Sequence, residues 1–257
     1  MTTQTRGTVR TEPAAKRVRA FLGGEPVFDT TRPVLVWEGP HLPVYYVPAA
    51  DVRAGLLVPS DHAERSPSRG VARFWSVRVG DRLAENAARQ YPDSPIEEIR
   101  GLIRFEWGAM DAWFEEDEEV FTHARDPHHR VDVLRSSRHV EVVVNGVVVA
   151  DSHRPTLLFE TGLPVRYYLP LTDVRTDLLR FSSSSSGCPY KGTASYWSLE
   201  AGGERLEDVV WTYPSPLPEG ARIAGLASFY NEKVDILVDG ELQERPGSPF
   251  ARRPAAA

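Results

Sequence analysis

The sequence contains a single cysteine, Cys188, among 257 residues. One cysteine allows neither an internal disulfide nor a zinc site made of cysteines alone, which is typical of proteins from a reducing compartment. The sequence also lacks an apolar run of about 18 residues, so we expect no membrane-spanning helix. Residues 1–16 have no apolar core of the kind found in secretion signals. We therefore expect a cytoplasmic protein without a membrane partner.

An excess of basic residues is also missing, because 30 Lys and Arg face 36 Asp and Glu, for a net charge of −6. Nonspecific binding to nucleic acid depends on cations that displace counterions from phosphates, so we expect no nucleic-acid partner. The sequence has no Walker-type loop and no GxGxxG motif. We predict no cofactor. The hydrophobic fraction of 41% is sufficient for a packed core.

What the chain does contain is an internal repeat. Pro67, Gly70 and Trp75 recur as Pro189, Gly192 and Trp197, at a spacing of 122 residues (189 − 67 = 122). Other matches at this spacing are Gly24/Gly146, Asp29/Asp151, Arg32/Arg154, Glu38/Glu160, Tyr45/Tyr167, Tyr46/Tyr168 and Asp51/Asp173. A constant offset through loops as well as strands indicates a tandem duplication of a whole domain.

Each copy has the pattern of a β domain. The stretch 140–149 places Asn145-Gly146 between β-branched runs, which is the strongest short signal for a hairpin. We predict a mainly β protein with two small β domains related by a pseudo-two-fold axis, a pseudo-dimer within one chain. The expected boundaries are a flexible tail 1–16, a first domain 17–114, a connector 115–137, a second domain 138–243 and a flexible tail 244–257. Residues 51–57 and 173–179 fit one short helix each, with the aspartate as N-cap.

An acidic run, 115–119, lies between the copies and is followed by a cluster of histidines, His123, His128, His129 and His139. An acidic run usually forms a solvated face. The spacing of these histidines fits no ligand signature and no cysteine lies nearby, so we predict no metal site.

Several motifs of the second copy resemble those of the domain-of-unknown-function 427 family, which some collections label nucleotidyltransferase-like. The resemblance covers both copies and is clearest in the second, in the segments Asn145-Gly146, 160–164, 166–168, 173–175 and 188–194. It implies a compact β domain similar to the β-tent group, which also includes the thalidomide-binding domain of cereblon and zinc-containing methionine sulfoxide reductases. Several of these relatives hold zinc with cysteines. With Cys188 alone, this chain departs from that pattern.

The turn 187–192 carries the densest chemistry in the sequence. Cys188 is either a nucleophile activated by a nearby cation or a small core residue. Lys191 either faces an anionic ligand or pairs with Glu160. The first copy has Ser66, Ser68 and Arg69 at the positions of Cys188, Tyr190 and Lys191. Because these reactive side chains occur only in the second copy, we expect the ligand-binding site there. The candidate ligand-binding residues are Glu160, Arg166, Tyr167, Tyr168, Cys188, Tyr190, Lys191 and Trp197.

Tyr167 and Tyr168 point to opposite faces if their segment is a strand, so only one of them can line a given pocket. The residues favour binding of a small cyclic or anionic ligand in an aromatic pocket of the second domain, between its sheets. Two alternatives stay open, a nucleotidyltransferase and a structural or interaction module. The sequence identifies neither the ligand nor a reaction.

Overall fold

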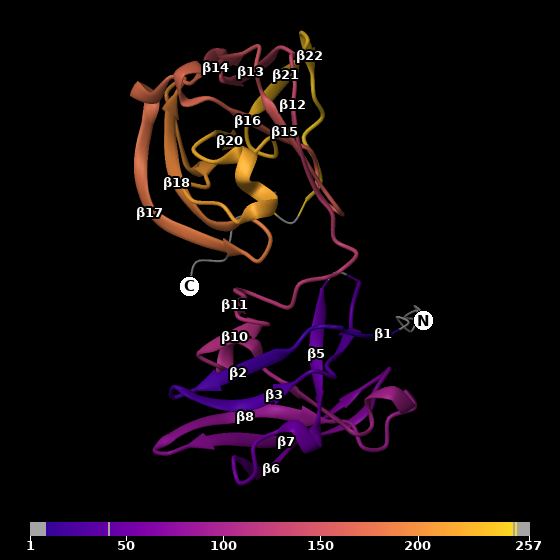
Figure 1. Cartoon of the computed structure of the whole chain (residues 1–257). Coiled ribbons are helices and arrows are strands. Elements are labelled where there is room, and N and C mark those ends of the chain that lie inside the picture. Colours follow the sequence, from indigo (N-terminus) through magenta and orange to yellow (C-terminus); the bar gives the residue numbers. More distant parts are fainter. Residues whose placement is uncertain (1–8, 41, 249, 251–257) are drawn as a thin grey trace. The chain divides into compact units, whose positions relative to one another are not determined.

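The computed structural model describes residues 9–40, 42–248 and 250 (Figure 1). The chain divides into two compact units, Met1–Asp126 and Pro127–Ala257. Both units consist of β-strands and short 3-10 helices, and each contains a seven-stranded and a four-stranded sheet. The prediction of a mainly β protein with two tandem domains is confirmed. The pseudo-two-fold relation between them stays a prediction. Among the described residues, no helix has both the length and the apolar character needed to cross a bilayer.

In the first unit the strand orders are β1-β4-β5-β9-β8-β7-β6 and β11-β10-β2-β3. The larger sheet contains β1 (Arg10–Pro13), β4 (Val34–Trp37), β5 (Pro43–Pro48), β6 (Leu57–Ser66), β7 (Gly70–Val79), β8 (Arg82–Gln90) and β9 (Leu102–Phe105). The smaller sheet contains β2 (Val18–Leu22), β3 (Glu25–Thr30), β10 (Ala112–Glu115) and β11 (Glu118–Glu119). The 3-10 helices are η1 (Ala49–Asp51), η2 (Glu97–Ile99) and η3 (Trp107–Ala109).

In the second unit the orders are β12-β15-β16-β20-β19-β18-β17 and β14-β13-β21-β22. The larger sheet contains β12 (Val131–Arg135), β15 (Thr156–Glu160), β16 (Arg166–Leu169), β17 (Leu179–Cys188), β18 (Gly192–Ala201), β19 (Glu204–Thr212) and β20 (Ala227–Phe229). The smaller sheet contains β13 (Val140–Val144), β14 (Val147–Ser152), β21 (Asp235–Val238) and β22 (Glu241–Leu242). The 3-10 helices are η4 (Leu171–Asp173), η5 (Thr176–Leu178) and η6 (Pro218–Ile223).

The two units share one strand order, because each strand of the second unit occupies the place of its sequence counterpart in the first. Their irregularities also coincide. The ladder between β7 and β8 shifts register between Trp75 and Val77, and that between β18 and β19 shifts between Trp197 and Leu199. Asn86 and Asp208, again 122 residues apart (208 − 86 = 122), both have φ of 51°. Bulges and left-handed residues at matched places support duplication beyond the sequence matches.

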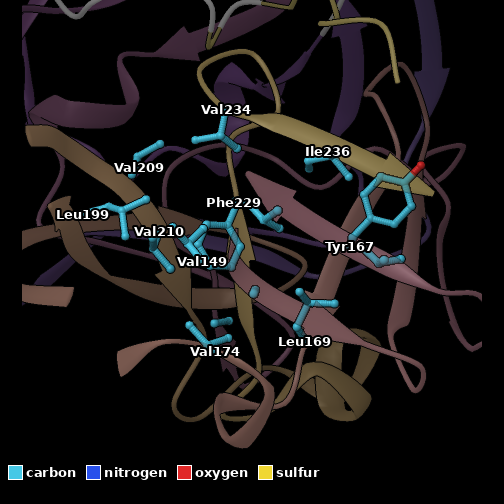
Figure 2. Packing of buried hydrophobic residues seen from close by; sticks show 14 of the residues in the cluster. Val149, Tyr167, Leu169, Val174, Leu199, Val209, Val210, Phe229, Val234 and Ile236 are labelled. Carbon is cyan, nitrogen blue, oxygen red and sulfur yellow. The ribbon is translucent and has the colours of Figure 1, made fainter. Parts of the chain in front are cut away.

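The main core of the second unit lies between its two sheets (Figure 2). Val140 and Val142 of β13 and Ile236 of β21 face this core from the smaller sheet. The larger sheet contributes residues such as Tyr167 and Phe229. Burial alternates along β13, as expected for a strand with one face against a core, although its sequence is a nearly continuous β-branched run.

The opposite face of the larger sheet, here called the second face, has its own cluster of buried residues. Its members are Val133, Leu158, Tyr168, Ala194, Trp211, Tyr213 and Ile223. The 3-10 helix η6 covers part of this face beside β12, where Arg222 Nη1 donates a hydrogen bond to the carbonyl of Val133 at 3.1 Å. The second face is therefore only partly apolar and carries the polar groups described below.

Three expected boundaries were wrong. Residues 10–13 of the predicted tail form β1, which pairs with β4 in the larger sheet. The connector is divided, since 118–119 pair with β10 in the first unit and 131–135 pair with β15 in the second. In the predicted C-terminal tail, Arg245 donates to Asp235 Oδ1 at 2.8 Å and Ser248 donates to Glu232. Residues 1–8 and 251–257 of the tails lie outside the described residues.

The helices predicted at 51–57 and 173–179 with aspartate caps were also wrong, since the second range contains only the 3-10 helix η5, whose N-cap is Arg175. Asp51 and Asp173 end 3-10 turns and do not cap helices. Asp173 accepts hydrogen bonds from Ser152 Oγ at 2.8 Å and Arg154 Nη2 at 2.7 Å. The aspartate thus joins the turn to the hairpin β13–β14, a tertiary contact that a local capping rule does not anticipate.

Candidate functional site

A buried ion pair lies at the centre of the candidate site. Glu160 is the last residue of β15, and Lys191 occupies the turn between β17 and β18. Lys191 Nζ donates to both carboxylate oxygens, at 2.5 Å to Oε1. The side chains are only 8% and 6% exposed. Of the two roles expected for Lys191, the structure shows the pairing with Glu160.

A histidine extends this pair. His129 Nε2 lies 3.0 Å from Glu160 Oε1, and the His129 ring stacks on Tyr190 with a centroid distance of 4.2 Å and an interplanar angle of 17°. Tyr190 is buried and His129 half-buried. The carboxylate therefore holds an ammonium group and an imidazole together at one end of the second face.

Tight packing fixes the turn that carries Lys191. Gly192 has φ of +93°, and a Cβ there would lie 3.4 Å from both Leu217 N and the carbonyl oxygen of Ser215. Leu217 N donates to the Lys191 carbonyl at 3.0 Å. Only glycine readily adopts this backbone conformation, so the Gly192 of the sequence motif places Lys191 beneath the loop 214–218.

Aromatic side chains line the second face beside the ion pair. Trp211 Nε1 donates to the hydroxyl of Tyr168 at 3.0 Å. Burial raises the pKa values of Tyr168, Tyr213 and Tyr230. These phenols therefore stay neutral at physiological pH. A neutral phenol both donates and accepts hydrogen bonds, which suits recognition of a polar ligand.

Cys188 lies on the same side of the sheet as Ser186, because both are on β17 and two residues apart. Ser186 Oγ and the Tyr196 hydroxyl are hydrogen-bonded at 2.6 Å. Cys188 is half-buried and free of any disulfide.

Arg166 occupies the same face but is committed to other partners. Its guanidinium donates to Glu232 at 2.8 and 2.6 Å and to Asn231 at 2.6 Å. It also lies 5.6 Å from the ring of Trp211 and 5.5 Å from that of Tyr230. Although burial opposes ionisation, the hydrogen bonds from Arg166 lower the pKa of Glu232. Arg166 thus packs against the rings of Trp211 and Tyr230 and links them to Glu232.

The structure separates two of the predicted site residues from the others. Tyr167 belongs to the main core, and Trp197 packs against the same cluster. Tyr168 belongs to the second face. The expectation that adjacent tyrosines face opposite sides is confirmed, and Tyr168 is the one near Glu160. The structure brings together Glu160, Lys191 and Tyr190. It places Arg166, Tyr168 and Cys188 on the same face without a hydrogen bond to Glu160 or Lys191 among the described residues, while Tyr167 and Trp197 lie on the opposite face, where the main core fills the expected pocket between the sheets.

Other residues of this face were not among the predicted site residues. They are His129, Ser186, Tyr196, Trp211, Tyr213 and Tyr230. Alternation along β18 and β19 was a usable signal for Tyr196 and Trp211. No local signal pointed to His129, because its contact with Glu160 joins residues 31 positions apart.

The comparison with known families agrees with this architecture. A family model described as "Domain of unknown function (DUF427)" matches residues 10–116 and 132–240. The chain belongs to this family and contains two tandem copies of its domain. No curated protein matches the chain.

Proposed function

We propose that the second unit binds a small cyclic ligand on its second face, beside the Glu160–Lys191 pair. The observation that carries this proposal is a buried ammonium–carboxylate–imidazole group next to neutral phenols and a half-buried thiol. Groups of this kind in one partly covered surface are characteristic of binding sites.

The energetics of the ion pair support a role beyond stability. Removing Lys191 and Glu160 from water carries a desolvation cost that their attraction only partly offsets. An apolar pair of similar volume would serve a core at least as well. The charged pair presents hydrogen-bonding groups in a fixed geometry. With two donors of the Lys191 ammonium directed at Glu160, a third remains for a ligand acceptor.

The character of the ligand follows from the residues around the pair. Tyr196 and Tyr230, both half-buried, offer flat surfaces and hydroxyl groups. Because Glu160 neutralises Lys191, the site favours a ring with hydrogen-bonding substituents over a highly charged anion. The thiol of Cys188 adds a polarisable contact at the same face.

The nucleotidyltransferase alternative finds less support at this site. Metal-assisted phosphoryl transfer needs carboxylates grouped around Mg²⁺. Glu160 is paired with Lys191 and Glu232 with Arg166. An interaction module is the other alternative. A ligand screen tests the binding proposal, and a separate pyrophosphate assay tests the nucleotidyltransferase.

The test is a thermal-shift screen of cyclic metabolite-like compounds against the full chain. A compound that binds only the native state at a hundred times its Kd adds ~2.7 kcal/mol of stability. Cys188→Ala and Tyr196→Phe remove groups outside the buried ion pair and are expected to reduce the shift. Ser66→Ala, at the position of Cys188 in the first unit, is the matched control and is expected to leave it unchanged.

Two outcomes would count against the proposal. One is a screen in which no compound stabilises the chain. The other is a compound whose thermal shift is the same in wild type, Cys188→Ala and Tyr196→Phe. Trp197→Phe, on the opposite face, is expected to keep the shift. Release of pyrophosphate from a nucleoside triphosphate with Mg²⁺, abolished by Lys191→Met, would favour the nucleotidyltransferase instead.

A further inference from the structure

We propose that His139, Asp151 and His153 form an open site for a divalent transition metal ion, separate from the second-face site. Each residue offers one ligand atom, and the three atoms lie within 4.8 Å of one another. Among the described residues, no other group of His, Cys, Asp and Glu side chains has a spacing that suits a metal ion.

The hairpin β13–β14 brings the three residues together. Val140 pairs with Ser152 and Glu141 with Asp151 in an antiparallel register. Continuing this register by one residue places His139 opposite His153, and their rings stack with centroids 4.0 Å apart at 11°. Residues directly opposite each other share a face of a sheet. Since Val140 and Val142 face the core, the histidines and Asp151 share the outer face.

The ligand atoms are well placed. His139 Nε2 lies 2.8 Å from Asp151 Oδ1, a distance that also suits two neighbouring ligands of one metal ion. His153 is exposed and, within the described part of the chain, its ring nitrogens make no hydrogen bond. Glu141 Oε2, 4.0 Å from His139 Nδ1, can orient the imidazole from behind. Two imidazoles and a carboxylate therefore converge at an accessible edge, because β14 is the edge strand of its sheet.

The donor set indicates which ions bind. Imidazole nitrogen suits zinc, copper and nickel better than magnesium or calcium. Three protein ligands leave positions for water, so we expect an exchangeable ion and not a closed structural site. From the sequence, His139 was grouped with His123, His128 and His129, and no metal site was predicted. The strand register instead places His139 opposite His153 and beside Asp151.

The first unit provides an internal reference. Arg17, Asp29 and Thr31 stand 122 residues before His139, Asp151 and His153 (139 − 17 = 122). There, Arg17 Nε donates to Asp29 at 2.7 Å, and the two side chains form a two-point ion pair. The carboxylate is present in both hairpins, but only the second surrounds it with histidines. Replacing a permanent cation by imidazoles converts a closed ion pair into a set of metal ligands.

The experiment titrates the full chain with Zn²⁺ and Ni²⁺ by calorimetry, and with Co²⁺ by visible absorption. We expect one ion per chain in wild type and a loss of at least about tenfold in affinity in His153→Thr and in His139→Arg. Each variant introduces the residue found at the equivalent position of the first unit, Thr31 or Arg17. Because His153 is exposed and His139 half-buried, we expect the fold, and so the circular dichroism spectrum, to be unchanged.

His62→Ala is the matched control. His62 Nε2 lies 3.1 Å from Glu64 Oε1, so it is an exposed histidine–carboxylate pair without a second histidine. Its removal is expected to leave the affinity unchanged. The proposal is overturned if wild type binds none of the three ions, or if His153→Thr binds them as tightly as wild type does.

Discussion

Each unit has a glutamate at the equivalent position of its larger sheet, Glu38 in the first and Glu160 in the second, but the groups around the two carboxylates differ. Glu160 in the second unit holds one ammonium group and one imidazole. Glu38 in the first unit lies near three guanidinium groups, with Arg104 Nη1 at 2.8 Å, Arg69 Nη2 at 3.6 Å and Arg89 Nη2 at 4.0 Å. Arg69 occupies the turn position of Lys191.

One arginine of the first unit stands where the second unit has an aromatic ring. Arg89 of β8 pairs with Arg104 of β9, and at the same place in the second unit Trp211 of β19 pairs with Ser228 of β20. Arg89 Nη2 also pairs with Glu106 Oε1 at 3.0 Å. The Tyr46 hydroxyl donates to Glu38 at 2.6 Å, and burial raises the pKa of this phenol. Duplication thus preserved a carboxylate beside a tyrosine, and divergence changed the cations around it.

The largest expected effect comes from breaking the compact pair of the second unit. Glu160→Leu leaves the Lys191 ammonium buried without a counter-ion, so we expect a loss of about 3–5 kcal/mol in the free energy of unfolding. Glu160→Leu combined with Lys191→Met is expected to recover most of it, because an apolar pair replaces a buried ionic one at little cost. Urea denaturation of the full chain measures both.

The first unit sharpens this prediction. Glu38→Leu also destabilises, but adding Arg69→Met is not expected to restore stability, because Arg89 and Arg104 remain beside the lost carboxylate. If Arg69→Met restores the stability of Glu38→Leu as fully as Lys191→Met restores that of Glu160→Leu, then Arg89 and Arg104 do not depend on the Glu38 carboxylate, and the proposed difference between the two units is wrong.

An intermediate effect is expected from Arg104→Ser, which introduces the residue found at this position in the second unit. The variant removes the 2.8 Å charged hydrogen bond to Glu38 while two cations stay nearby. We expect a loss of about 1.5–3 kcal/mol, measured by urea denaturation. Arg73→Ser is the control, because Arg73 and Asp93 form an exposed pair at 3.7 Å whose loss should cost under about 1 kcal/mol. Equal losses in the two variants would contradict the assigned role of Arg104.

The sequence was sufficient to predict the duplication and the β class, because matched glycines and alternating apolar residues are local signals. It also predicted the opposite orientation of Tyr167 and Tyr168, which follows from strand geometry alone. Of the two roles open for Lys191, pairing with Glu160 is the one that the structure shows.

What the sequence did not predict depends on contacts between distant segments. The role of His129 requires the connector to lie beside β15, and the sharing of Asp151 by two histidines requires the hairpin register. Trp197 was assigned to the ligand site because its large flat side chain suits a ring-shaped ligand. Contacts between distant strands decide which face of β18 lies against the main core, and Trp197 is on that face.

The smallest effect concerns the aspartate that ties a 3-10 turn to the hairpin in each unit. Hydrogen bonds from Arg154, followed by those from Ser152 and Thr172, lower the pKa of Asp173 to about 2 from its ordinary value of 3.8. In the first unit Thr30 and Arg32 donate to Asp51, but Ala50 stands at the position of Thr172. Asp173 therefore has one more donor than Asp51.

A lowered pKa means that the folded state favours the carboxylate, so its contribution to stability is complete above pH 3.8 and disappears as the pH falls towards 2. Because Arg154 is largely exposed, we expect Asp173→Asn to cost only about 1 kcal/mol at pH 7. The difference between variant and wild type should narrow between pH 4 and pH 2, as followed by urea denaturation across that range. Asp51→Asn should cost less at pH 7, since it removes fewer hydrogen bonds. A difference for Asp173→Asn that stays constant down to pH 2 would show that the hydrogen bonds from Arg154, Ser152 and Thr172 do not favour the ionised carboxylate.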